Sequence, residues 1–324
     1  ASPCCLVLSI FECKEPCCEC PILSALFAKA LDAAHDAAAQ QHYPQGALYM
    51  VATPIGNLAD ISLRALHVLQ LADTVACEDT RHTQSLLRAY GISKGGAQTL
   101  AVHQHNEAEA AQHVIQRLQG GERVAYVSDA GTPAISDPGA RLASAVIAAG
   151  LRVLPLPGAS SIITALSACG AVAPSDEASG FLFAGFLSSK AGLRQSAIAA
   201  FQNEARSVVL LEAPHRIEAL AKDLSILGNR PVTLARELTK QFEQIHTVPA
   251  SEASAWLAAD PQHARGEFVV VIHPAPTQAE SGDGERVLKL LLAELPLKTA
   301  VKLAAEISGE SKNVLYDKAL ALKA

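Results

Sequence analysis

Two aspartates, two glycines and two prolines fall within the twelve residues from Ser128 to Gly139. An apolar run, Val124 to Val127, comes directly before them and is typical of a buried parallel strand. A pattern of small residues over 140–149 follows and predicts a helix. Because ligands of open α/β sheets bind at the carboxyl ends of strands, this segment predicts a binding loop.

Further polar clusters follow the other predicted strands in the same way. Their sequences are TPIGN at 53–57, EDTR at 78–81, HQHNE at 103–107, PGASS at 157–161, EAPHR at 212–216 and RELTK at 236–240. Since the carboxyl ends of parallel strands share one edge of a sheet, the clusters predict a large cleft rather than a single catalytic dyad. Each cluster also has a structural interpretation as a turn, a helix cap or a surface ion pair, and their shared edge favours a binding function.

Common nucleotide-binding and hydrolase signatures are absent from the sequence. It has no G-x-x-x-x-G-K-[ST] and no G-x-G-x-x-G after a strand. The segment GASSI at 158–162 begins like a nucleophile elbow but lacks the closing glycine. His103 and His105 lie two residues apart without a third ligand, so we expect no metal site there. A P-loop enzyme, an NAD enzyme and an ordinary α/β hydrolase are therefore disfavoured.

The length and composition of the chain favour a folded protein of about two domains. The chain has 324 residues, of which 50% are hydrophobic and 18% charged, and its formal net charge is −6. That charge argues against a surface coated with basic residues, although a local basic groove for RNA remains compatible with it. No apolar run reaches about 18 residues, so we expect no membrane-spanning segment.

The cysteines separate the first residues from the rest of the chain. Six of the eight lie before residue 21, and only Cys77 and Cys169 come later. Two lone cysteines in the body suggest a reducing, cytoplasmic compartment. The pair Cys17 and Cys20 has zinc-ligand spacing but lacks a second pair to complete four ligands, so no metal is expected. We interpret residues 1–46 as a disordered or non-native extension outside the fold.

Strands that alternate with helices predict βαβ units with parallel pairing, and hence an α/β fold. We expect an N-terminal α/β domain over 47–158, a C-terminal α/β domain over 159–274, a linker over 275–284 and a helical accessory module over 285–324. From residue 298 onward the module carries five lysines against three acidic residues, which suggests an RNA contact.

Taken in order, these segments resemble the tetrapyrrole-methylase superfamily, the class III S-adenosylmethionine methyltransferases. Within it they are most similar to the branch that methylates small-subunit ribosomal RNA. The matching segments are VATPIGNL at 51–58, EDTR at 78–81, SDAGTPAISDPG at 128–139, LPGASS at 156–161, EAPHR at 212–216, RELTK at 236–240 and GEFVV at 266–270. The resemblance covers about 47–324, and its specificity comes from the ordered series, since any one piece alone is weak. It implies two α/β domains with S-adenosylmethionine in the cleft between them, plus a small C-terminal helical module.

The resemblance also implies which residues form the site. For the cofactor they are Pro54, Asp129, Ala130, Gly131, Thr132, Ile135, Ser160, Ser161, Ile162, Leu211, Glu212 and Glu267. For RNA they are Thr53, Asn57, Arg81, His215, Arg216, Arg236 and Lys240. We expect Gly131 to leave no room for a side chain beside the cofactor.

The reaction that the resemblance implies is 2′-O-methylation of a cytidine ribose in the decoding region of 16S rRNA, and we expect a homodimer. A ribose hydroxyl is a weak nucleophile, so a base would help, and Glu78, Asp79 and Glu237 are the candidates. Two alternatives stay open: a methyltransferase of the same fold that acts on a tetrapyrrole, and a non-catalytic ribosome-assembly protein that binds RNA. The clusters at 53–57 and 78–81 favour the rRNA branch.

Overall fold

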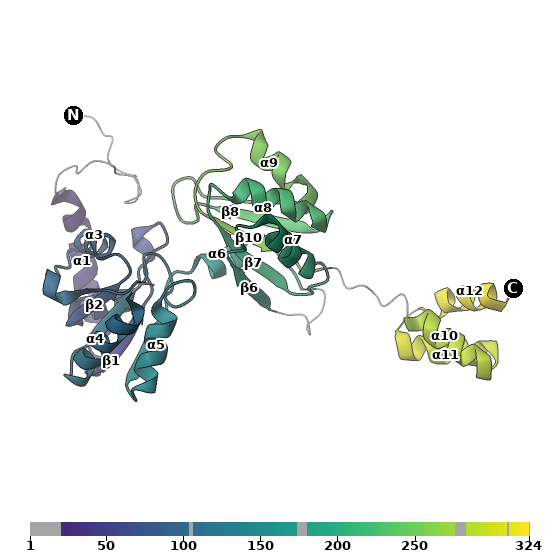
Figure 1. Ribbon diagram of the computed structural model, residues 1–324, viewed down its shortest axis with the longest axis horizontal. Coiled ribbons are helices and arrows are strands. Elements are labelled where there is room, and N and C mark those ends of the chain that lie inside the picture. The colour runs from purple at the N-terminus through teal and green to yellow at the C-terminus, as the bar shows by residue number, and fades with distance from the viewer. Residues whose placement is uncertain (1–20, 104–105, 174–179, 276–282, 310, 324) are drawn as a thin grey trace. The chain divides into compact units, whose positions relative to one another are not determined.

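A computed structural model describes residues 21–103, 106–173, 180–275, 283–309 and 311–323. The chain forms two α/β domains and, as a separate compact unit, a module of three helices (Figure 1). This architecture confirms the predicted fold class. In the part of the chain that the structure describes, no helix is long and apolar enough to cross a membrane. Cys17, Cys20 and His105 lie outside the described residues.

The N-terminal α/β domain is built on a five-stranded parallel sheet in the order β3-β2-β4-β1-β5. Its strands are β1 (Ala47–Val51), β2 (Thr74–Cys77), β3 (Thr99–Ala101), β4 (Val124–Val127) and β5 (Arg152–Leu156). Its helices are α1 (Pro21–Ala38), α2 (Leu63–Leu71), α3 (Thr80–Ala89), α4 (Glu107–Gln119) and α5 (Gly139–Ala148), with short 3-10 turns at Leu58–Asp60 and Gly96–Gln98. The central strands are buried and apolar, as a parallel sheet covered on both faces requires.

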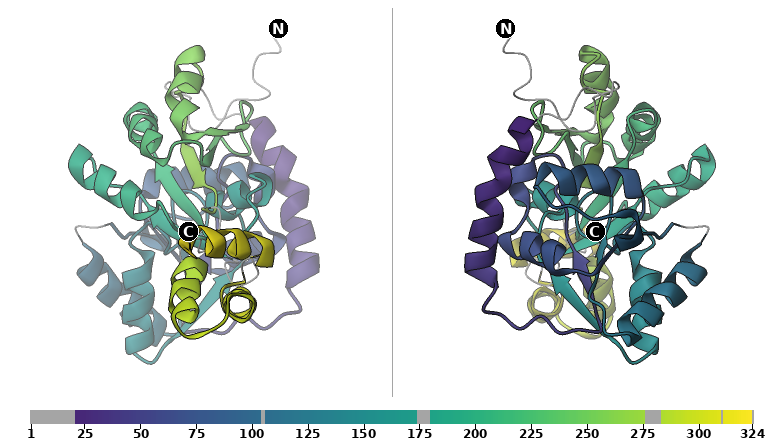
Figure 2. Two further views of the ribbon diagram at one scale, coloured as in Figure 1. Left: turned by 90° about the vertical axis from the view of Figure 1, so that its right-hand side faces the viewer. Right: turned by 90° about the vertical axis from the view of Figure 1, so that its left-hand side faces the viewer.

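Helix α1 differs from the expectation that residues 1–46 lie outside the fold. It packs against α2 and appears beside this domain in both views of Figure 2, in dark purple. Ala34 and Ala38, one helical turn apart, are buried, and Phe27 and Leu31 pack against the same core. The alanine-rich stretch is therefore an amphipathic helix whose small residues allow close approach.

The C-terminal α/β domain has a mixed sheet in the order β6-β7-β10-β8-β9. Its strands are β6 (Phe181–Gly185), β7 (Ser207–Glu212), β8 (Pro231–Arg236), β9 (Gln244–Pro249) and β10 (Phe268–Ile272). Only β6 and β7 pair in parallel, because β10 lies antiparallel between β7 and β8, and β9 is antiparallel to β8. The expectation of parallel pairing is therefore wrong for most of this sheet. The connection over 237–243 contains no helix, and such a short connection returns a strand antiparallel.

Helices cover this second sheet on one face and α6 (Ser161–Ala168) packs on the other. The covering helices are α7 (Ala191–Ala200), α8 (Ile217–Leu224) and α9 (Ala253–Ala259), with 3-10 turns at Ser225–Leu227 and Ala250–Glu252. Alternate residues of β7 divide between the two faces: Val208 and Leu210 join the core under the helices, whereas Val209 and Leu211 join the core with α6.

The last helices are α10 (Asp283–Glu294), α11 (Leu297–Ser308) and α12 (Lys312–Lys323). They have a core of their own, in which Leu288, Ala304 and Leu315 are buried. Gly309 ends α11 in the left-handed conformation, at φ 69°, a position that favours glycine. The module is thus held together by its own apolar residues.

Candidate active site

The loop after β4 is pinned to the end of β1 by two backbone hydrogen bonds. The Thr53 N–H donates to the Gly131 carbonyl and the Gly131 N–H donates to the Thr53 carbonyl, each at 3.0 Å. Gly131 adopts φ 81°, and a Cβ built on it would lie 3.2 Å from Cγ2 of Ile55. The structure therefore gives a local reason for this glycine, namely its left-handed backbone and the neighbouring isoleucine.

The second half of the same loop is organised by Asp137. Its carboxylate accepts hydrogen bonds from the N–H groups of Ala134 and Gly139 and from the Tyr126 hydroxyl. Ala134 has φ 69°, which is uncommon for a residue with a side chain, and the bonds from its N–H to Asp137 stabilise this conformation. A strained but well-bonded loop is preorganised for a ligand.

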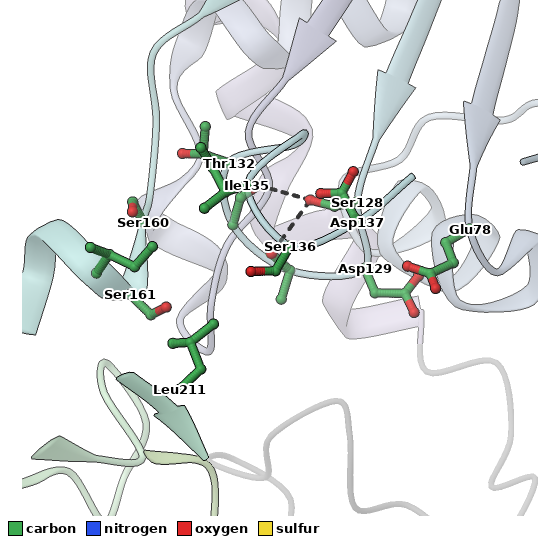
Figure 3. A pocket seen from close by; sticks show the side chains of 13 residues that line it. Glu78, Ser128, Asp129, Thr132, Ile135, Ser136, Asp137, Ser160, Ser161 and Leu211 are labelled. Atoms are coloured by element: carbon green, nitrogen blue, oxygen red, sulfur yellow. Dashed lines mark hydrogen bonds between the residues drawn. The ribbon is translucent and has the colours of Figure 1, made fainter. Parts of the chain in front are cut away.

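An open pocket with about 570 Å³ of empty space lies beside this loop. Figure 3 shows Glu78 and Asp129 on one side of the pocket, and Ser160, Ser161 and Leu211 on the opposite side. Leu211 comes from the second sheet, so residues of both α/β domains line the pocket.

Nine residues predicted for the cofactor line this pocket: Asp129, Ala130, Gly131, Thr132, Ile135, Ser160, Ser161, Ile162 and Leu211. Pro54, Glu212 and Glu267 are not among its lining residues. Glu212 follows Leu211 in β7, so its side chain points to the opposite face, where it forms an ion pair with Arg216 at 3.1 Å. Ser128, Ser136 and Asp137 also line the pocket and were missing from the predicted set, although they belong to the same sequence segment.

Glu78 is the one of the three candidate bases that lines the pocket. Burial raises its pKa, and the nearby carboxylates of Asp129 and Asp137 raise it further, while His103 acts in the opposite direction. A carboxylate with a raised pKa accepts a proton more readily, so the side chain is suited to a base.

Asp79 has a structural task at the start of α3. Its carboxylate accepts hydrogen bonds from the N–H groups of Arg81 and His82, which makes it the helix N-cap. These backbone hydrogen bonds lower its pKa. A carboxylate held in its ionised form in this way is a weaker base than Glu78.

Glu237 belongs to a network at the end of β8. Its Oε1 accepts from the Glu267 N–H at 3.1 Å and from Nζ of Lys240 at 2.9 Å. Lys240 also contacts Glu267 Oε2 at 3.2 Å. Burial lowers the pKa of Lys240, but the hydrogen bond and charge of Glu237 and the charge of Glu267 outweigh it, so the pKa is raised.

The residues predicted for RNA lie in different surroundings. The side chain of Arg81 is 90% exposed, and its Nη2 lies 3.4 Å from Oδ2 of Asp79. His215 is exposed as well, whereas Thr53 is buried. Asn57 caps the 3-10 turn that follows it, by accepting from the Ala59 N–H.

Arg216 and Arg236 bind carbonyls of the protein itself. Nη2 of Arg216 donates to the Leu187 carbonyl. Arg236 is only 6% exposed, and its guanidinium donates to the carbonyls of Arg265 and Phe242. These contacts suit side chains that hold loops in place better than side chains that grip phosphate. Within the described residues, no three His, Cys, Asp or Glu side chains converge as they would around a metal ion.

Two α/β domains with a pocket beside the glycine-containing loop of the first sheet form the tetrapyrrole-methylase fold. The family described as Tetrapyrrole (Corrin/Porphyrin) Methylases matches residues 47–254, and the RsmI C-terminal HTH domain matches residues 278–323. Two solved structures share the fold at 18% identity: the cobalamin biosynthetic enzyme cobalt precorrin-4 methyltransferase, at TM-score 0.50 over 71% of this chain and 98% of that one, and the methyltransferase CobJ, at 0.51 over 70% and 94%.

The chain belongs to the tetrapyrrole (corrin/porphyrin) methylase family, in the group of proteins named ribosomal RNA small subunit methyltransferase I. The protein of that name from Pseudomonas aeruginosa is 51% identical over 281 residues, which are 85% of this chain and 97% of the relative. The one from Escherichia coli O157:H7 is 48% identical over 280 residues, 85% of this chain and 95% of the relative.

S-adenosylmethionine is the cofactor of this family, and the pocket fits it. The carboxylate of Asp129 in the pocket wall favours a ligand with positive charge. On the other side, Ser161 and Ile162 belong to the first turn of α6, whose N-terminus favours a carboxylate group. The pocket thus offers complementary charge to both the cationic and the anionic groups of the cofactor.

Proposed function

We propose that the protein transfers a methyl group from S-adenosylmethionine to the ribose 2′-hydroxyl of a cytidine in the decoding region of 16S rRNA. The substrate class is supported by relatives named ribosomal RNA small subunit methyltransferase I, which match 85% of the chain. The observation that carries the chemistry is Glu78, a carboxylate with a raised pKa in the wall of the pocket.

The residues of the chain have two tasks in this reaction. When bound, S-adenosylmethionine supplies a methyl group on a positively charged sulfur. The loop held by Asp137 and Gly131 positions the reactants. Alignment of that kind lowers the activation barrier by up to roughly 7–11 kcal/mol. Glu78 accepts the proton of the ribose hydroxyl at its carboxylate, which makes the oxygen a better nucleophile.

The direct test is transfer of a labelled methyl group to small ribosomal subunits that lack the modification. We expect label in the RNA, dependent on the full-length protein and abolished by S-adenosylhomocysteine. Two other outcomes would overturn the proposal. Label in an added tetrapyrrole but not in RNA identifies the small-molecule alternative. Binding to subunits with no transfer identifies a non-catalytic assembly protein.

We also propose that the C-terminal module contacts RNA and that the protein acts as a homodimer in the cytoplasm. Lys298 and Lys302 on α11 and Lys312 on α12 are exposed, which supports an electrostatic contact. Removal of residues 275–324 should weaken binding to subunits and leave cofactor affinity unchanged. Sedimentation of the full-length protein checks the dimer, and a monomer mass at assay concentration would contradict it.

A further inference from the structure

Two exposed phenylalanines lie along one edge of the second sheet. Phe186 comes directly after β6, and Phe242 lies in the connection from β8 to β9. The strands β6, β7 and β8 run in one direction, and β9 and β10 run in the other. The ends of the first three and the starts of the last two therefore share an edge, and both phenylalanines belong to it.

Both side chains are large, apolar and mostly exposed to solvent. Phe186 is 56% exposed and Phe242 is 67% exposed. Phe242 lies between β8 and β9, so three to four steps between neighbouring strands separate it from β6, about 14–19 Å at the usual strand spacing. The two rings are therefore too far apart to cover each other.

The loops that carry these rings are held in place by two arginines, the partly buried Arg216 and the buried Arg236. Nη2 of Arg216 donates to the carbonyl of Leu187, the residue after Phe186. Nη1 of Arg236 donates to the carbonyl of Phe242 itself, at 3.2 Å. Arg216 is in turn paired with the buried Glu212. A ligand that binds these rings finds their backbone already ordered, which lowers the entropic cost of binding.

The same edge lies next to the pocket. Leu211, the second-last residue of β7, lines the pocket. The exposed cation Lys190 follows β6, on the side where Phe186 lies. Exposed aromatic rings beside cations are what single-stranded RNA needs, because unpaired bases stack on the rings while phosphates bind the charges.

We infer that this edge, defined by Phe186 and Phe242 and here called the aromatic edge, stacks unpaired bases of the RNA and so presents a ribose to the pocket. The inference rests on the proposed function, and it adds a stacking contact for the substrate strand. It also changes the role of Arg216 and Arg236. They are positioning residues that hold the two rings, and the rings touch the RNA.

The test compares Phe186→Ala and Phe242→Ala with Ile226→Ala in the full-length protein. Ile226 is 54% exposed and lies in the 3-10 turn before β8, at the opposite edge of the sheet, so it is a matched control. We would measure the affinity for a fluorescent, unstructured single-stranded RNA, the affinity for S-adenosylmethionine by calorimetry, and the oligomeric mass by sedimentation.

Each phenylalanine variant should bind the RNA roughly 5- to 150-fold more weakly, the effect expected from loss of one stacked base. Ile226→Ala should bind as the parent does, and Phe242→Trp should restore affinity because it restores a ring. Cofactor affinity and mass should be unchanged in all variants.

Four outcomes overturn the inference. Unchanged RNA affinity in both alanine variants removes the stacking contact. Equal recovery by Phe242→Leu and Phe242→Trp means that apolar bulk is enough and no base stacks. A change of oligomeric mass assigns the edge to a second copy of the chain. Methyl transfer by the parent protein is measured in parallel: if the parent transfers no methyl group to RNA, the proposed function itself fails, whereas normal transfer by all variants rejects only the aromatic edge.

Discussion

The backbone N–H of Asn57 donates a hydrogen bond of 3.1 Å to the hydroxyl of Thr239, which joins the loop after β1 to the loop after β8. A Cβ on the neighbouring Gly56 would clash with Lys240, so the two loops are in close contact. Thr239 itself has φ 65°, in the left-handed region that side chains rarely adopt. This contact joins the two α/β domains.

Replacing Thr239 by Ala should therefore destabilise the protein by about 0.5–1.5 kcal/mol, because the Asn57 N–H loses its acceptor. Thr239→Ser is the matched control, since it keeps the hydroxyl and, like alanine, removes the branched side chain. Chemical denaturation measures both. If the alanine and serine variants have equal stability, the hydrogen bond contributes nothing.

Glu78→Gln should lower the rate of methyl transfer by about 10²- to 10⁴-fold while cofactor affinity stays close to that of the parent. In the parent, the rate should fall as pH decreases through the raised pKa of Glu78, because the base must be ionised. Glu109→Gln, an exposed position on α4, is the control and should leave the rate unchanged. A full rate in Glu78→Gln would exclude this residue as the base.

The same substitution should stabilise the fold. Because the pKa of Glu78 is higher in the folded protein than its ordinary value of 4.5, ionisation costs folding free energy. That cost is absent below the unfolded pKa and fully present above the folded pKa. The stability difference between Glu78→Gln and the parent should therefore grow as pH rises through this window. A difference that is independent of pH would contradict the raised pKa.

Gly131→Ala and Gly150→Ala form a matched pair, since both glycines have a positive φ, 81° and 74°. Each substitution should cost roughly 1–2 kcal/mol of stability for the left-handed backbone. Only Gly131→Ala should also weaken cofactor binding, because Gly131 lines the pocket and is bonded to Thr53. Calorimetry with S-adenosylmethionine tests this, and equal affinity in the two variants would separate the Gly131 loop from the cofactor.

Arg81→Ala and Arg236→Ala should have different effects, the first on RNA binding and the second on stability. Arg81 is exposed, so its loss should leave stability unchanged. The slope of the logarithm of RNA affinity against the logarithm of salt concentration should become shallower by about 0.7, the change expected for one lost phosphate contact on a single strand. Arg236 is buried with its donors bound to carbonyls, so its loss should lower the melting temperature. Arg88→Ala, on the same helix as Arg81, is the surface control. Equal salt slopes for Arg81→Ala and Arg88→Ala would remove Arg81 from the RNA contact.

The local elements and the pocket loop were predictable from the sequence because their signals are short-range. The apolar run of β4 and the glycines and aspartates of 128–139 identify a strand followed by a rigid loop, and the structure has both. The place of β10 was not predictable in this way, because its pairing partners β7 and β8 are chosen by long-range packing.

The roles of individual side chains were also hard to predict from the sequence, because they too depend on long-range packing. A motif shows that Arg236 follows a strand, but whether its guanidinium faces solvent or the carbonyl of Arg265 depends on a loop far along the chain. Likewise, Glu212 and Leu211 are neighbours in sequence, yet strand alternation places only Leu211 at the pocket.

The proposed reaction is tested most sharply by nucleoside mass spectrometry of small-subunit RNA after reaction with the parent protein and with Glu78→Gln. We expect 2′-O-methylcytidine to form with the parent, at one site in the decoding region. The nucleoside should be nearly absent with Glu78→Gln, although that variant still binds S-adenosylmethionine. A methyl group on a base instead of a ribose, or equal amounts of 2′-O-methylcytidine from both proteins, would contradict the proposed reaction.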